Sequence, residues 1–169
     1  MTCAAHPLDL LSHDERPLAN EFLSKGIVRV KVEDPAALDR MQRTLADVAA
    51  DCLGESVPKD PERFLNQIHT RVTPERLNEF RLHLITALNQ EAWFSPAYFS
   101  LGRRALETIV GNELVMQRKI NLSIQLPHDR GSLLPIHSDV WSGDSPYEVV
   151  LWVPYVSCYR TKSMYFCDI

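Results

Sequence analysis

The stretch that decides the predicted fold is residues 134–166, LPIHSDVWSGDSPYEVVLWVPYVSCYRTKSMYF. Its centre is His137-Ser138-Asp139, followed by a turn-rich loop and then by an apolar run at residues 149–153 that is typical of a buried strand. In an extended chain the side chains of residues i and i+2 point to the same face, so His137 and Asp139 are predicted to lie side by side. One imidazole and one carboxylate are two of the three ligands in the facial triad that holds non-haem Fe(II).

Two stretches of the sequence resemble the Fe(II)/2-oxoglutarate-dependent dioxygenases of the phytanoyl-hydroxylase-like group. They are NLSIQLP at residues 121–127 and LLPIHSDVWSGDSPYEVVLWVPYVSCYRTKSMY after it. Within that group they are most similar to a bacterial subgroup encoded in surface-carbohydrate gene clusters. The closer similarity covers residues 114–166, and a looser family pattern reaches back to Glu21.

The resemblance implies a function and a site. Fe(II) would be held by His137 and Asp139, and 2-oxoglutarate would be the cosubstrate. The reaction would hydroxylate a small substrate, with a sugar nucleotide or a glycan precursor as the expected class. Neutral imidazole and ionised carboxylate are the forms that bind the metal.

The same resemblance implies an α+β fold, with a double-stranded β-helix core of the jelly-roll or cupin type and a set of N-terminal packing helices. We expect one domain over residues 1–169, mainly helical with one strand over 1–111, and the first half of the β-helix over 112–169. Such a core has about eight strands, whereas 112–169 accommodates roughly four or five. Either the chain is truncated, or it completes its iron site in an unusual way, so full catalysis by this chain alone is not expected.

Local patterns predict several elements before that core. The helix predicted over residues 34–54 has the clearest start and stop signals, because Asp34 can cap it, Pro35 suits its first turn and Gly54 can end it. The helix predicted over residues 73–88 has one apolar face that is predicted to be buried, formed by Leu77, Phe80, Leu84 and Leu88. The predicted helices cover residues 13–25, 34–54, 61–70, 73–88 and 95–111, and a strand is predicted over 27–32.

Residues 120–126 alternate between apolar and polar side chains, which predicts a strand. Its polar face faces either a cavity beside the metal ligands, which would make Asn121 and Gln125 candidates for binding the cosubstrate, or water. Lys162 either binds the carboxylate of 2-oxoglutarate or is a lysine with no role beyond its turn. Trp141 and Asp144 follow the metal ligands and either line a substrate entrance or serve only their turn.

No histidine follows His137, so the third iron ligand is open. Three other histidines are candidates if the fold brings them close, although for His128 the pattern favours a solvated loop residue. A partner chain is the alternative source, since an open half-barrel exposes unpaired sheet edges and would favour a homo-oligomer. The candidates are His69, His83 and His128.

Bulk properties exclude some classes of function. The net charge is −4 without a basic tract, so neither nucleic acid nor an anionic membrane is expected as a partner. No targeting segment and no apolar run of membrane-spanning length occurs, and the four cysteines show no CxxC spacing, so a cytoplasmic protein with reduced thiols is expected. Two other functions stay open: a non-catalytic domain that binds carbohydrate or carboxylate, and an assembly fragment whose edges pair with another polypeptide.

Overall fold

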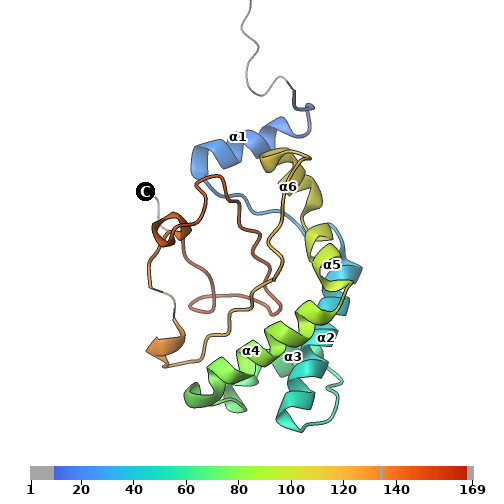
Figure 1. The fold of residues 1–169 in the computed structure, drawn as a ribbon, viewed down its shortest axis with the longest axis vertical. Coiled ribbons are helices and arrows are strands. Elements are labelled where there is room, and N and C mark those ends of the chain that lie inside the picture. The colour runs from blue at the N-terminus through green and yellow to red at the C-terminus, as the bar shows by residue number, and fades with distance from the viewer. Residues whose placement is uncertain (1–9, 134, 167–169) are drawn as a thin grey trace, which may run out of the picture.

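The computed structural model describes residues 10–133 and 135–166, and its regular structure is helical. In Figure 1 the α-helices form an arc along one side of the molecule. The chain that follows the α-helices, residues 111–133 and 135–166, is called the C-terminal half below, and it runs on the other side as uncoiled chain apart from short 3-10 helices. The α-helices are α1 (Arg16–Lys25), α2 (Pro35–Leu53), α3 (Pro61–Asn66), α4 (Pro74–Gln90), α5 (Phe94–Ser100) and α6 (Arg103–Val110), and the short 3-10 helices are η1 (Ile68–Thr70), η2 (Arg130–Ser132) and η3 (Asp139–Ser142).

The start and stop signals of α2 act as the sequence predicted. The Asp34 carboxylate accepts a hydrogen bond from the Ala37 N–H at 2.9 Å, and Pro35 occupies the first turn. Gly54 ends the helix in the left-handed region at φ 69°, where a side chain would be strained. These residues fix both ends of the longest helix in the described chain.

The core lies where α2 packs against α3, α4 and α5. The predicted inner face of α4 is confirmed, because Leu77, Phe80, Leu84 and Leu88 are all buried. Opposite it, α2 presents small side chains that let the two helices approach closely. The buried residues of α2 are Met41, Leu45, Ala46, Ala49 and Ala50.

The single helix predicted over residues 95–111 is wrong in one respect, because the chain breaks at Leu101 and Gly102 to give α5 and α6. Gly102 lies against the C-terminal half, where an added Cβ would be 3.1 Å from Leu151 Cδ1. The Glu33 carboxylate accepts hydrogen bonds from the N–H groups of Arg104 and Ala105. A carboxylate at a helix N-terminus is stabilising, so Glu33 favours a new helix at this point.

The predicted double-stranded β-helix is wrong, because the described residues contain no strand. Their nearest feature is one isolated antiparallel bridge between Tyr159 and Lys162. The strand predicted over 27–32 is likewise chain without a ladder. A strand requires a neighbouring backbone to complete its hydrogen bonds, and here helices cover one face of each extended segment while no second segment pairs with its edge.

Side chains of the helices take the place of strand partners. The Asn89 side chain bonds both the N–H and the C=O of Ile120, at 2.8 and 2.9 Å. Further along, the Tyr98 hydroxyl donates to the Leu151 carbonyl, and the Gln42 amide donates to the Tyr155 carbonyl at 2.6 Å. The C-terminal half is therefore attached to the helices by individual polar contacts as well as by apolar packing.

The alternation predicted over residues 120–126 survives in the burial pattern. Ile120 and Leu126 belong to the core, and Leu122 and Ile124 pack against it. The polar residues between them, Asn121, Ser123 and Gln125, are exposed.

Among the described residues no helix is long and apolar enough to cross a membrane.

Candidate functional site

His137 and Asp139 lie at the start of η3, in the connection between η2 and the uncoiled residues 149–154. Ser138 has an extended backbone, with φ −125° and ψ 135°, and Asp139 then begins a turn in which the Trp141 N–H donates to the Ser138 carbonyl at 2.9 Å. Gly143 ends this turn with φ 100°. The predicted metal-binding pair thus sits at the start of a turn and not on a strand as the sequence predicted.

The two side chains nevertheless meet, as the i, i+2 spacing predicted. The distance from His137 Nε2 to Asp139 Oδ1 is 3.6 Å. On the other side of the ring, Nδ1 lies 2.7 Å from the Pro135 carbonyl oxygen. A carbonyl oxygen only accepts hydrogen bonds, so Nδ1 carries a proton, and in the neutral ring the lone pair is then on Nε2, beside the carboxylate.

This geometry suits two ligands of one metal ion. Two donor atoms that each lie about 2.1 Å from a metal are about 3.0 Å apart in octahedral and about 3.4 Å apart in tetrahedral geometry. The observed 3.6 Å requires a closure of about 0.6 Å for octahedral and about 0.2 Å for tetrahedral geometry. The backbone carbonyl that holds Nδ1 is the kind of outer contact that fixes the orientation of a metal-binding imidazole.

Both side chains are accessible to solvent, with 43% of His137 and 50% of Asp139 exposed. Within residues 10–133 and 135–166 no group of three histidine, cysteine or acidic side chains is arranged to hold a metal. The three candidate third ligands therefore do not join this pair in the described chain: His69 is in η1, His83 is in α4, and His128 is in a turn with φ 61°.

The predicted cosubstrate residues are dispersed. Asn121 and Gln125 are exposed on the outer side of their extended segment. Lys162 donates through Nζ to the Asn66 side chain at the end of α3, and lies 5.8 Å from the centre of the Tyr159 ring. Its ammonium is thus engaged with the helical half.

The predicted substrate residues lie next to the pair. Trp141 is in η3 and 77% of its surface is exposed. Asp144 directly follows the glycine that ends η3, and its N–H donates to the Asp139 carbonyl at 3.3 Å. The turn therefore holds an exposed aromatic ring and a second carboxylate within five residues of Asp139.

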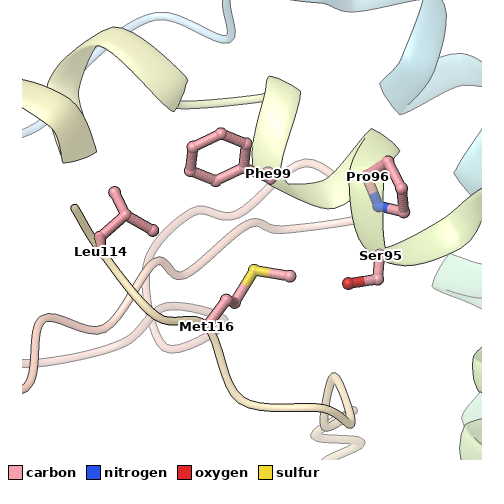
Figure 2. Close-up of a pocket in the computed structure, with 5 residues that line it drawn as sticks. All are labelled: Ser95, Pro96, Phe99, Leu114 and Met116. Carbon is pink, nitrogen blue, oxygen red and sulfur yellow. The ribbon is translucent and has the colours of Figure 1, made fainter. Parts of the chain in front are cut away.

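Two hollows of the described surface were not foreseen from the sequence, and neither is lined by His137 or Asp139. In Figure 2 an open, mostly apolar hollow of about 290 Å³ lies between α5 and the extended chain that follows α6. Its lining combines residues from both, and the side chain of Met116 points toward Ser95 and Pro96. This hollow is lined by Ser95, Pro96, Phe99, Leu114 and Met116. A second hollow, of about 190 Å³, is lined by Cys52, Leu53, Arg71, Val72, Arg76, Glu79, Phe80 and His83.

One contact at the candidate site was missed, namely the Pro135 carbonyl that holds His137. A backbone carbonyl has no signature in the sequence, so only a structure identifies it.

Comparisons of the chain with protein-family models, with curated proteins and with solved structures gave no match.

Proposed function

We propose that His137 and Asp139 of this chain hold Fe(II) in an oxygenase site that uses 2-oxoglutarate as cosubstrate and hydroxylates a small carbohydrate-related substrate such as a sugar nucleotide or a glycan precursor, and that the described residues alone do not complete this site. The observation that supports this is the pairing of Nε2 and Oδ1 at 3.6 Å, with Nδ1 held by a carbonyl. A bare histidine–carboxylate contact is common on protein surfaces. What distinguishes this contact is that Nδ1 is occupied by the Pro135 carbonyl, so that in the neutral ring the Nε2 lone pair faces the carboxylate, which is the arrangement that a metal requires.

The bound iron would supply oxidation of an unactivated C–H bond, and the residues of this chain have simpler tasks. His137 and Asp139 bind the ion on one side and leave its other positions open. The Pro135 carbonyl keeps the imidazole in its metal-binding tautomer. The third protein ligand comes from outside residues 10–133 and 135–166, or water takes its position.

The substrate class is supported by Trp141 and Asp144. An exposed aromatic face and a carboxylate suit the apolar faces and hydroxyl groups of a sugar. Fe(II) is kept reduced in a cytoplasm, and Cys52 and Cys158 are free thiols in the structure, which suits the same compartment.

The test is anaerobic addition of Fe(II) and 2-oxoglutarate to the full chain, with the visible charge-transfer band of the chelate as the readout. The expected result is a band that is lost in Asp139→Ala and His137→Ala and kept in Asp144→Ala, the matched carboxylate outside the pair. A folded protein without a band, or a band that survives in Asp139→Ala, overturns the iron site.

The exposed Trp141 also favours a second candidate, a domain that binds carbohydrate without turnover. In that case Trp141 fluorescence responds to a sugar ligand, the response survives a chelator and Asp139→Ala, and no succinate is formed. Trp141→Ala should abolish it.

A further inference from the structure

Residues 149–155 run along the helices with a two-residue alternation in exposure, and the chain then bends at Tyr155 and Val156. Leu151, Val153 and Tyr155 turn toward the helices, and the last two pack against the core. Between them, Val150 and Trp152 turn outward, with 61% and 45% of their surfaces exposed. This period of two is that of a strand, although the described chain provides no strand beside it.

The backbone contacts of this segment are made by side chains of the helices. The Leu151 carbonyl accepts from Tyr98, and from the bend at residues 155–156 onward the Tyr155 carbonyl accepts from Gln42 and the Ser157 N–H donates to Glu62. The Leu151 contact fixes which edge of the extended residues faces Tyr98. In an extended chain the N–H and C=O groups of successive residues point to opposite edges, so Val150 and Trp152 present theirs on the edge away from Tyr98.

That second edge is open. Within residues 10–133 and 135–166, nothing accepts from the N–H groups of Val150 and Trp152 or donates to their carbonyls. The Glu148 N–H, by contrast, donates to the Ser145 carbonyl at 3.0 Å, and Pro154 has no N–H. The open edge is therefore two residues long with a defined end on each side. An open edge of this kind binds another extended backbone.

We propose that the occupant of this edge is the same edge of a second copy of the chain, paired antiparallel and centred on Leu151. In this register Val150 of each copy lies opposite Trp152 of the other, and each such pair exchanges both of its N–H···O=C bonds. All N–H and C=O groups of Val150 and Trp152 are then satisfied. The two-fold axis stands perpendicular to the ribbon, so both sets of helices lie on the same face of it.

The segment is complementary to itself in this register. A β-branched residue opposite an aromatic residue is a favourable cross-strand pair, and Val150–Trp152 occurs twice by symmetry. Val149 lies opposite Val153, and Glu148 lies opposite Pro154, so no like charges face each other. Pro154 has no N–H and therefore ends the ladder along each strand. The pairing uses the same edge of both copies, so it closes at a dimer. A heterologous peptide would have to reproduce this pattern, whereas a second copy carries it already.

The dimer is independent of the iron site, because His137 and Asp139 lie outside the paired segment. The interface is small, so self-association is weak, and sedimentation velocity of the full chain over roughly 10 μM to 1 mM covers the relevant range. The disrupting variant is Val150→Pro, which removes an N–H that has no partner within the described chain. Val115→Pro is the matched control, since Val115 is a 97% exposed valine in the uncoiled chain after α6.

The expected result is a reversible dimer in the unchanged protein and in Val115→Pro, with dimerisation weakened at least tenfold in Val150→Pro. Amide exchange measured by NMR gives the register without a mutation. The N–H groups of Val150 and Trp152 should gain protection as concentration rises, while that of Leu151, which points to the other edge, should not.

Each other result overturns the proposal. A monomer at every concentration excludes the second copy. A dimer that Val150→Pro leaves intact uses a different surface. Protection that rises at Leu151 and not at Val150 and Trp152 contradicts the parity on which the pairing rests.

Discussion

The side chain of Asn89 makes the two hydrogen bonds to Ile120 that a neighbouring strand would make. Its Oδ1 accepts from the Ile120 N–H at 2.8 Å, and its Nδ2 donates to the Ile120 carbonyl at 2.9 Å. One amide on α4 thereby fixes the start of residues 120–126 against the helices, at the place where α6 and its connection have returned the chain to the core.

Replacing Asn89 by alanine should destabilise the protein by about 2 kcal/mol, because it leaves the partly buried N–H and C=O of Ile120 without partners. The measurement is urea unfolding followed by circular dichroism. Asn78→Ala is the control, since Asn78 is on the same helix and makes only an exposed contact with Arg81. Equal stabilities for the two variants would contradict a structural role for the Asn89–Ile120 contact.

Two buried tyrosines should respond oppositely to loss of their hydroxyl groups. Tyr98→Phe should cost about 1–2 kcal/mol, because the Leu151 carbonyl loses its donor. Tyr155→Phe should be neutral or slightly stabilising, because its buried hydroxyl has no hydrogen-bond partner among the described residues. Thermal unfolding of both variants checks this contrast, and a larger loss in Tyr155→Phe would show that this hydroxyl has a partner.

The same tyrosines make stability depend on alkaline pH. Burial raises the pKa of Tyr98 to about 12 and also raises the pKa of Tyr155. The unfolded chain loses these protons from about pH 10 upward while the folded chain keeps them, so the free energy of unfolding falls as pH rises, by at most about 1.4 kcal/mol per pH unit for each tyrosine. Urea midpoints between pH 9 and 11 should therefore fall less steeply in Tyr98→Phe than in the unchanged protein.

At acid pH the contact between Glu62 of α3 and Ser157 should weaken. Hydrogen bonds from the Ser157 hydroxyl, at 2.6 Å, and from its N–H lower the pKa of Glu62 below its ordinary value of 4.5. Because the folded-state pKa is depressed, this contribution is present above pH 4.5 and disappears as pH falls through the folded-state pKa. The unchanged protein should therefore exceed Ser157→Ala in stability at neutral pH, and the difference should shrink below pH 4.5. Thr161→Ala, at an exposed position nearby, should show no such pH dependence.

Helix positions could be predicted because their signals are local. Asp34 and Gly54 bound α2 as expected, and the inner face of α4 follows from its 3.6-residue period. The break between α5 and α6 was missed because a single glycine such as Gly102 is tolerated within a helix. The residue that favours a new helix there, Glu33, lies 71 residues before its partner Arg104 in the sequence.

The strands were predicted wrongly for a different reason. Period two in residues 120–126 predicts which side chains face inward, and the burial of Ile120 and Leu126 agrees with it. The apolar run at 149–153 predicted a buried strand, and this was wrong because Val150 and Trp152 are exposed. Neither pattern predicts what pairs with the backbone, because Asn89, Tyr98 and Gln42 lie elsewhere in the sequence. At the candidate site, the contact between His137 and Asp139 was predictable from their spacing, whereas the carbonyl that orients His137 was not.

The contacts that hold the C-terminal half bear on the order of folding. They join residues far apart in the sequence: 53 residues separate Tyr98 from Leu151, 95 separate Glu62 from Ser157, and 113 separate Gln42 from Tyr155. Closing such long loops is entropically costly before apolar packing compensates for it, whereas helices form from local contacts. The helices therefore act as a template that is complete first, and substitutions in residues 149–157 should speed unfolding while leaving the folding rate nearly unchanged.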